Sequence, residues 1–414
     1  MAIQDIGTRS RFWRRVLPIL GPGIVVMLAD TDAGSIITAA QSGAEQGYKL
    51  LLLQLILIPI LFIVQELTVR LGLVTGRGHG ELIKERFGAG WAWLSVLTMA
   101  VACIGALVTQ LVGMAGVAQL FGVPVWLMMV LTIGLIVTMV LTGSYHAVER
   151  IAVCFGLFEL IFLGVAWYAG PVPSEIVLGL AQAPIGDRHF LYLAAANIGA
   201  VIMPWMVFYQ QSAVVDKGLR PADLKIARWD TAIGAVVTQV IMASVLIAVA
   251  ATIGRNHEAV SLDDVPQIAA ALTPVLGDTV GRLAFALGIS GAAMVATIVV
   301  SLTAAWGLGE VTGYRHSLEH HPREAPWFYG IFIASLVAGG ILVTSGTALV
   351  QLSVAVEVMN ALLLPIVLGF LYLLARKALP PEYQLRGWYA WVVGIVIFVT
   401  AAFGLYAGIS GALG

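Results

Sequence analysis

The chain has 414 residues, of which 60% are hydrophobic and only 11% are charged. A water-soluble globular protein is nearer ~45–50% apolar and ~25% charged, so this composition predicts an integral membrane protein. The 22 Lys and Arg residues nearly cancel the 23 Asp and Glu residues, which excludes a basic surface for nucleic acid. The two cysteines, Cys103 and Cys154, lie in apolar runs, so neither a disulfide framework nor a thiolate metal cluster is expected.

Eleven apolar runs, each long enough to cross a bilayer, follow one another along the chain. Their hydrophobicity does not alternate with a period of two, so helices are predicted and strands of a barrel are excluded. No long linker divides the runs, so a single all-α transmembrane domain is expected over residues 1–414. The runs lie at about 17–46, 50–69, 92–120, 125–143, 151–171, 189–212, 230–254, 280–309, 327–346, 349–375 and 389–412.

Lys and Arg residues are unevenly divided between the two sides of this arrangement. If the N-terminus is cytoplasmic, only Lys49, Arg188, Arg255 and Arg282 fall outside, and the others lie in cytoplasmic segments. The positive-inside rule therefore predicts a cytoplasmic N-terminus and an external C-terminus, in a bacterial inner (plasma) membrane. The first apolar run is not followed by a small-residue cleavage site, so it is expected to remain as a span.

Two spans are interrupted near their middle. The first contains residues 30–35 (DTDAGS), and the sixth contains residues 203–205 (MPW). Similar interruptions five spans apart are typical of two inverted five-helix repeats, with discontinuous first and sixth helices and a substrate site near the midplane. The first repeat is expected over about 17–171, the second over about 189–375, and an additional helix over about 389–412.

Asp32 is the most informative residue of the first interruption. It lies about 23 Å along its run, where an ionised carboxylate costs at least ~2.5–3.5 kcal/mol. An ion pair would compensate this charge, but the Lys and Arg residues lie at span ends or in loops. A bound cation is therefore the favoured counter-charge. Asp30, two residues earlier, either lines the same vestibule or lies in solvent.

The second interruption offers a different type of ligand. Met203 precedes the helix-breaking Pro204, and its thioether is placed to meet whatever Asp32 binds. Non-helical backbone at the two interruptions also frees carbonyl oxygens from about Ala29 and Ala200. Together with the Ser35 hydroxyl, these groups describe a divalent-metal site, and the sulfur favours a transition ion over Ca²⁺ or Mg²⁺.

Acidic residues in other spans include Glu357, Glu159 and Glu66. Glu357 either faces the site, as a ligand or a proton carrier, or pairs with a hydroxyl or water in the bundle. Glu159 has the same alternatives but is less favourably placed. Glu66 lies four residues before Arg70 and is expected to form an ordinary helix pair near the inner membrane edge.

One further pattern resembles a metal site. His316 and His320 have the i, i+4 spacing that can chelate a metal, and His321 follows, but a solvated cytoplasmic loop is the favoured interpretation. No P-loop, Ser/His/Asp grouping or HExxH motif occurs, so an enzyme is not expected. No cofactor beyond a transported ion and no obligate protein partner is expected; the partner is the lipid bilayer.

The residues at the two interruptions resemble the Nramp family of divalent metal transporters over nearly the whole chain. The similar segments are 21–22 (GP), 32–35 (DAGS), 41–44 (QSGA), 47–48 (GY) and 200–204 (AVIMP). The resemblance implies that Asp32, Met203, Ser35 and the carbonyls of Ala29 and Ala200 are direct ligands. It also places Glu357 where the family tends to have a Gln that reaches the ion.

The chain departs from that family at informative positions. Ala33 replaces a Pro, Ser35 replaces an Asn, and Trp205 replaces a His. Gln110 is the polar candidate in the third span, where Nramps typically carry acids for proton movement. The proton route is therefore expected to be lost, as in the divergent magnesium-transporting branch, although Met203 is retained here. The remaining candidates for a vestibule or proton path are Asp30, Glu159, Trp205 and Gln110.

The sequence thus predicts an importer of Mn²⁺ or a similar transition metal that is weakly or not proton-coupled. The alternatives are a related Mg²⁺ transporter that binds a partly hydrated ion, an organic-solute or amine symporter of the same fold, and a membrane scaffold or sensor. A proton is not required by energetics, because two charges crossing about 100 mV gain about 4.6 kcal/mol.

Overall fold

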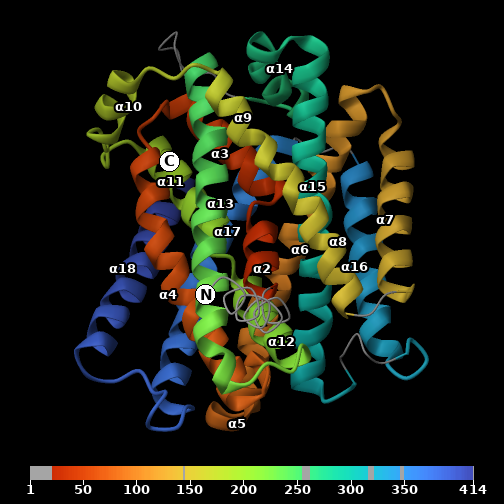
Figure 1. Ribbon diagram of the computed structural model, residues 1–414, viewed down its shortest axis with the longest axis vertical. Coiled ribbons are helices and arrows are strands. Elements are labelled where there is room, and N and C mark those ends of the chain that lie inside the picture. The colour runs from red at the N-terminus through yellow and green to blue at the C-terminus, as the bar shows by residue number, and fades with distance from the viewer. Residues whose placement is uncertain (1–20, 143–144, 254–261, 316–320, 346–348, 414) are drawn as a thin grey trace, which may run out of the picture.

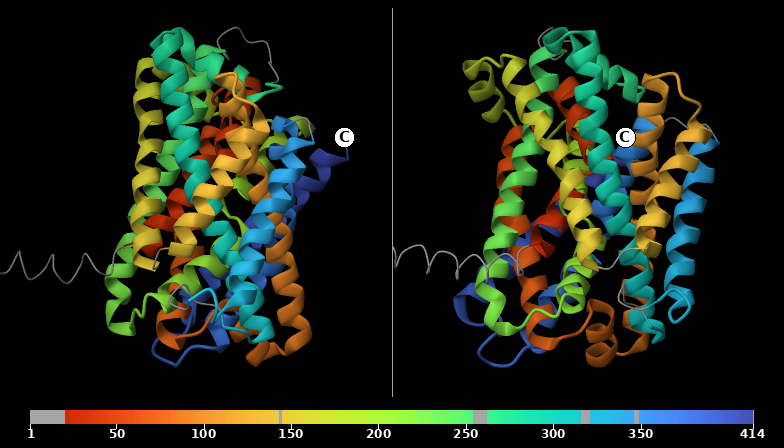
Figure 2. Two further views of the ribbon diagram at one scale, coloured as in Figure 1. Left: turned by 90° about the vertical axis from the view of Figure 1, so that its right-hand side faces the viewer. Right: turned by 45° about the vertical axis from the view of Figure 1, so that its right-hand side comes forward.

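The computed structural model describes residues 21–142, 145–253, 262–315, 321–345 and 349–413. In these residues every regular element is a helix, and the long helices stand side by side along one axis (Figures 1 and 2). Helix α5 lies at one end of the bundle, and α10 and α14 lie at the opposite end (Figure 1). The all-α fold class is therefore confirmed.

Most of the predicted spans are single long helices with bounds close to those expected. They are α4 (Leu51–Thr75), α6 (Ala89–Leu120), α7 (Val125–Thr142), α13 (Leu224–Thr252), α15 (Asp278–Thr312), α16 (Pro326–Thr344), α17 (Leu349–Lys377) and α18 (Gly387–Ala412). Short elements that were expected as loops are α5 (His79–Phe87), α10 (Pro173–Leu180), η2 (Pro221–Asp223) and α14 (Val265–Leu276).

Three spans are interrupted. The first is divided into α2 (Pro22–Asp30) and α3 (Ala33–Gln46), and the sixth into α11 (Arg188–Val201) and α12 (Pro204–Asp216). The fifth contains a 3₁₀ turn, η1 (Leu157–Leu160), between α8 (Tyr145–Gly156) and α9 (Ile161–Tyr168). The first two breaks were predicted, whereas the third was not.

The helices of the structure give a smaller number of candidate spans than the sequence does. Nine helices in the described residues are long and apolar enough to cross a membrane, or ten if α2 and α3, bent by 47°, count as one span. The apolar part of α7, Val125–Leu141, is shorter than the others. The predicted count of eleven is therefore not confirmed.

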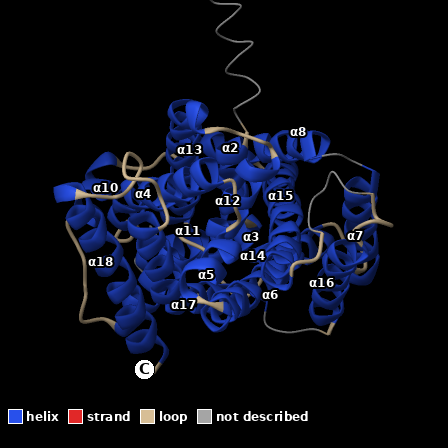
Figure 3. Ribbon diagram, turned by 90° about the horizontal axis from the view of Figure 1, so that it is seen from below, coloured by secondary structure: helices blue, strands red, loops and turns tan. Residues whose placement is uncertain are grey.

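The breaks in the first and sixth spans lie in the middle of the bundle. Viewed from below in Figure 3, α3, α11 and α12 are surrounded by α4, α6, α13, α15 and α17, with α7 and α16 on one flank and α18 on the other. Both breaks are consequently shielded from lipid and solvent by other helices, and residues 194–214 around the second break are buried throughout. This position explains how polar groups are tolerated there.

Helix α13 fixes the start of α2. The backbone N–H groups of Gly21 and Gly23 donate to the carboxylate of Asp230 on α13, at 3.2 Å and 2.7 Å for Oδ2. This is a helix cap supplied by a residue 207 positions away from Gly23. It satisfies backbone donors that the first turn of any helix leaves free and places a negative charge at the positive end of α2.

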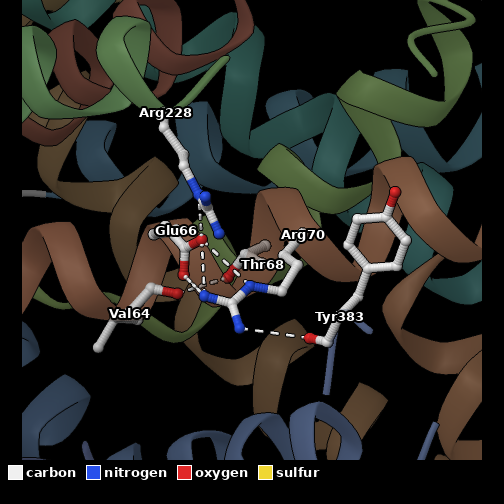
Figure 4. Close-up of polar contacts among 6 residues, drawn as sticks. All are labelled: Val64, Glu66, Thr68, Arg70, Arg228 and Tyr383. Carbon is white, nitrogen blue, oxygen red and sulfur yellow. Dashed lines mark hydrogen bonds and ion pairs between the residues drawn. The ribbon is translucent and has the colours of Figure 1, made fainter. Parts of the chain in front are cut away.

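A second buried cluster contains the pair expected for Glu66 and extends it. Its carboxylate pairs with Arg70, 2.6 Å away, and also with Arg228 of α13 at 2.6 Å (Figure 4). Arg70 further donates to the carbonyl oxygen of Tyr383 at 3.3 Å. The side chain of Glu66 is only 4% exposed. The predicted helix pair is therefore present, and it is part of a buried junction of α4, α13 and the α17–α18 connection.

Candidate metal-binding site

Asp32 lies at the break between α2 and α3 and caps α3. Its Oδ1 accepts from the backbone N–H of Ser35 at 2.7 Å, and its Oδ2 accepts from Nε2 of Gln110 on α6 at 2.6 Å. It is fully buried. No Lys or Arg in the described part of the chain forms an ion pair with it; the arginine pairs seen there are with Glu66 and Glu85. The carboxylate is therefore held in position without a cationic partner.

The second break lies directly against the first. Ile202 and Met203 are non-helical, and Pro204 begins α12. The hydroxyl of Ser35 donates to the carbonyl oxygen of Ala200 at 3.1 Å, which joins the start of α3 to the last turn of α11. The two interruptions predicted from the sequence thus meet through one hydrogen bond.

Met203 and Trp205 form a unit at the start of α12. The indole Nε1–H of Trp205 donates to the sulfur of Met203 at 3.0 Å, and both side chains are buried. The thioether, expected as a soft ligand, already serves as a hydrogen-bond acceptor. A metal that uses this sulfur has to share or displace the indole N–H.

Glu357 brings α17 to the first break. A Cβ atom added to Gly34 would lie 2.5 Å from Oε1 of Glu357, so this carboxylate reaches the backbone of α3. Its Oε2 accepts from Asn360 at 2.9 Å, while Oε1 is buried without a hydrogen-bond partner. Glu357 thus lies against the first break, and its role as a ligand or proton carrier stays a prediction.

Gln110 holds the first break in position and does not merely line it with a polar group. Its Oε1 accepts from the backbone N–H of Ala33 at 2.9 Å, while its Nε2 donates to Asp32. Both ends of the amide therefore hold the first break, and an amide carries no titratable proton. The sequence suggested Gln110 as a polar candidate but did not predict that it positions Asp32.

Asp30 and Glu159 lie next to this site. Asp30, at most 1% exposed, is buried, which excludes the alternative that it lies in solvent. Glu159 is also buried, and it lies within electrostatic range of both Asp30 and Asp32. Ala29 is buried in the last turn of α2. His316 and His320, the expected chelating pair, lie outside the described residues.

The site therefore combines carboxylate oxygens, a hydroxyl, a backbone carbonyl and one thioether, all inaccessible to solvent in this structure. Oxygen-rich sets suit hard and borderline divalent ions, and the sulfur adds affinity for softer ones. Such a set has no nucleophile or general base directed at an organic substrate. These donor groups are able to bind and release a cation.

Comparison with known proteins agrees with this geometry. The sequence model of natural resistance-associated macrophage protein-like (Nramp) proteins matches residues 23–410. The chain belongs to the Nramp family. The predicted family is thereby confirmed. The prediction of a multi-pass membrane transporter, and not an enzyme, is confirmed as well.

Curated Nramp relatives are similar to the chain at modest identity. Metal transporter Nramp6.2 of Populus trichocarpa is 31% identical over 52% of this chain and 40% of its own length. The divalent metal cation transporter MntH of Brucella suis is 28% identical over 71% of this chain and 66% of its own length. MntH of Agrobacterium fabrum is 25% identical over 96% of this chain and 90% of its own length.

Solved structures share the fold of this chain. The Eremococcus coleocola manganese transporter, in a complex with a bis-isothiourea compound, has a TM-score of 0.75 at 20% identity and covers 97% of this chain and 89% of its own. MhsT in complex with L-phenylalanine has a TM-score of 0.67 at 12% identity, with coverage of 94% and 98%. At these identities the likeness shows the fold.

Proposed function

We propose that this Nramp protein imports Mn²⁺ or a similar divalent transition metal by alternating access. Asp32, Ser35, Met203, Glu357 and the carbonyls of Ala29 and Ala200 are the proposed ligands. The observation that carries the proposal is the buried carboxylate of Asp32, which has no cationic partner among the described residues and lies against the second break through the Ser35–Ala200 hydrogen bond. A bound cation supplies the missing charge.

Transport is proposed to run inward, towards the end of the bundle where α5 lies. Most Lys and Arg residues of the loops fall at that end by the topology predicted from the sequence, which favours a cytoplasmic position for it. The membrane potential then drives a divalent ion in the required direction without a second ion. Gln110 in place of an acid on α6 supports transport that is not obligatorily coupled to protons.

A related Mg²⁺ transporter is the second candidate, and one contact favours it. Because the indole of Trp205 already donates to the sulfur of Met203, the site can operate without this ligand. Mg²⁺ keeps several of its waters and gains little from a thioether. An organic-amine symporter shares the fold, but the family match and the small, polar surroundings of Asp32 support a metal ion.

The decisive experiment measures uptake into proteoliposomes held at a negative internal potential, with Mn²⁺, Fe²⁺, Mg²⁺ and Ca²⁺ compared. Asp32→Ala is expected to abolish uptake of the transported ion while the chain still folds, and Asp187→Ala, at the exposed start of α11, is the matched control. A pH dye inside the vesicles should report no acidification that tracks metal entry. Wild-type uptake by Asp32→Ala would refute the site.

A further inference from the structure

The first break brings together four buried acidic side chains, more than one divalent ion can balance. Asp30, Asp32, Glu159 and Glu357 are each at most 1% exposed, and Asp32 interacts electrostatically with the other three. No ion pair to Lys or Arg involves any of them in the described part of the chain. A divalent ion at the proposed site neutralises two of four carboxylates. The carboxyl groups of Asp30 and Glu159 are then left without a partner.

Helix packing brings the two remaining acids, Asp30 and Glu159, within electrostatic range of each other. A Cβ atom added to Gly156 would lie 2.5 Å from Cδ1 of Leu28, so the end of α8 touches α2 there. Both segments run in the same direction, and three residues further along each of them Thr31 faces Glu159. Asp30, next to Thr31, is within electrostatic range of the same carboxylate.

These two carboxylates differ from Asp32 in one respect. Both oxygens of Asp32 accept hydrogen bonds, from Ser35 and Gln110. By contrast, all four carboxylate oxygens of Asp30 and Glu159 are buried without a partner at hydrogen-bonding geometry. An ionised carboxylate buried without a hydrogen-bond partner is strongly unfavourable, and a bound cation would satisfy it.

Oxygen donors complete the surroundings of the pair. The hydroxyls of Thr31 and Thr238 of α13 are hydrogen bonded to each other, which brings a third helix to the same place. No sulfur or imidazole nitrogen is among these groups, and carboxylate and hydroxyl oxygens are the ligands preferred by hard cations. Two carboxylates match the charge of one divalent ion.

We propose that Asp30 and Glu159, together with the hydroxyls of Thr31 and Thr238, form a second cation site that takes a hard divalent ion such as Ca²⁺ or Mg²⁺. The proposal rests on the proposed function, because it assigns Asp32 and Glu357 to the transported ion. The two sites differ in selectivity: the first includes the thioether of Met203, and the second consists of oxygen alone. The chain therefore binds hard ions independently of Met203.

The experiment measures binding stoichiometry on the full-length chain in lipid nanodiscs by equilibrium dialysis with Mn²⁺ and, separately, Ca²⁺. The wild type is expected to bind about two Mn²⁺ ions per chain, and Glu159→Gln or Asp30→Asn about one. Ca²⁺ affinity should fall at least about tenfold in Glu159→Gln but remain in Met203→Ala. Glu175→Gln, at an exposed position in α10, is the matched control and should behave as the wild type.

Binding of a single Mn²⁺ by the wild type, or of two by Glu159→Gln, would overturn the second site. Loss of the second divalent ion when choline is replaced by Na⁺ would assign the site to a monovalent ion and overturn the divalent assignment. If Glu159→Gln does not fold, anomalous diffraction from wild-type crystals soaked in Mn²⁺ decides: two peaks support the site, and one peak at Asp32 overturns it. Asp32→Ala that still binds both ions would instead refute the proposed function.

Discussion

Two regions of the molecule bury carboxylates, and they treat them in opposite ways. Around Glu66, two arginines approach one carboxylate and a backbone carbonyl accepts from Arg70, so the acid and both of its partners are engaged (Figure 4). Around the first break, Glu357, Asp30 and Glu159 keep oxygens without any partner. Both regions lie inside the same helical bundle, so burial alone does not distinguish them.

The difference distinguishes carboxylates that stabilise the packing of the helices from carboxylates that are available to bind a ligand. A buried ion pair whose members satisfy each other fixes the packing of three chain segments and has no capacity left for a ligand. A buried carboxylate oxygen without a hydrogen-bond partner makes the metal-free protein less stable. That oxygen is available to bind a cation. We therefore expect Glu357, Asp30 and Glu159, and not Glu66, to take part in cation binding.

The strongest test of this difference between buried carboxylates is a matched pair of isosteric substitutions. Glu66→Gln leaves two arginines, one of them buried, without a counter-charge, and should destabilise the protein by about 3 kcal/mol. Glu357→Gln removes an unsatisfied charge and should leave stability unchanged or raised. Apparent melting temperatures in the same detergent, without metal, measure the two effects.

The effect on metal affinity should be large for Glu357→Gln and small for Glu66→Gln, the reverse of the effect on stability. Glu357→Gln is expected to weaken Mn²⁺ binding, whereas folded Glu66→Gln protein should bind Mn²⁺ as the wild type does. If both substitutions lowered the melting temperature equally, the division between structural and binding carboxylates would be wrong.

A smaller effect concerns His79, at the same end of the bundle as the Glu66 cluster. Burial lowers the pKa of His79 to about 4, and its Nδ1 lies 3.0 Å from Oε1 of Gln211. The unfolded chain binds this proton near pH 6.5, so stability is lost as the pH falls from about 6.5 towards 4, by up to about 3 kcal/mol. Melting temperatures measured across this pH interval test the expectation.

Other groups also titrate in that interval, so the control is the difference between two proteins. His79→Asn keeps an amide N–H that can donate to Gln211 but cannot take up the proton. Its pH dependence should be shallower than that of the wild type below pH 6.5. Parallel curves would show that His79 contributes nothing to acid sensitivity.

The smallest expected effect sharpens the description of the transport site. Met203→Ala should weaken Cd²⁺ and Mn²⁺ binding by about tenfold while Mg²⁺ changes little, because a thioether contributes little to a hard ion. Competition binding in nanodiscs measures the ratio, and Met242→Ala, a buried methionine of α13 outside the proposed ligand set, controls for lost volume. An equal loss for every ion would favour the hydrated Mg²⁺ alternative.

The sequence predicted those parts of the structure that depend on local chemistry. Pro204 and the polar segment around Asp32 cannot continue an apolar helix, so both breaks were identified within a residue or two. The matching positions of the breaks also indicated that they face each other, as the Ser35–Ala200 hydrogen bond shows. The ligand assignments themselves stay a prediction.

The parts that were missed depend on contacts between distant segments. Arg228 lies 162 positions from Glu66, so an i, i+4 pattern revealed only half of that cluster. Gln110 holds Asp32 across 78 positions. The 3₁₀ turn at Glu159 follows Gly156, whose missing side chain lets α2 approach, but a lone glycine in an apolar run gives little warning of it.

The cap on α2 sets how readily one end of the bundle opens. Any motion that withdraws the start of α2 from α13 separates Gly21 and Gly23 from Asp230 and exposes their N–H groups. Loss of a cap costs about 1–2 kcal/mol, which lowers the population of the open state by about tenfold. Asp230 thus favours the closed position of α2. It would shorten the time for which this end of the bundle is open, and so limit the return of transported ions.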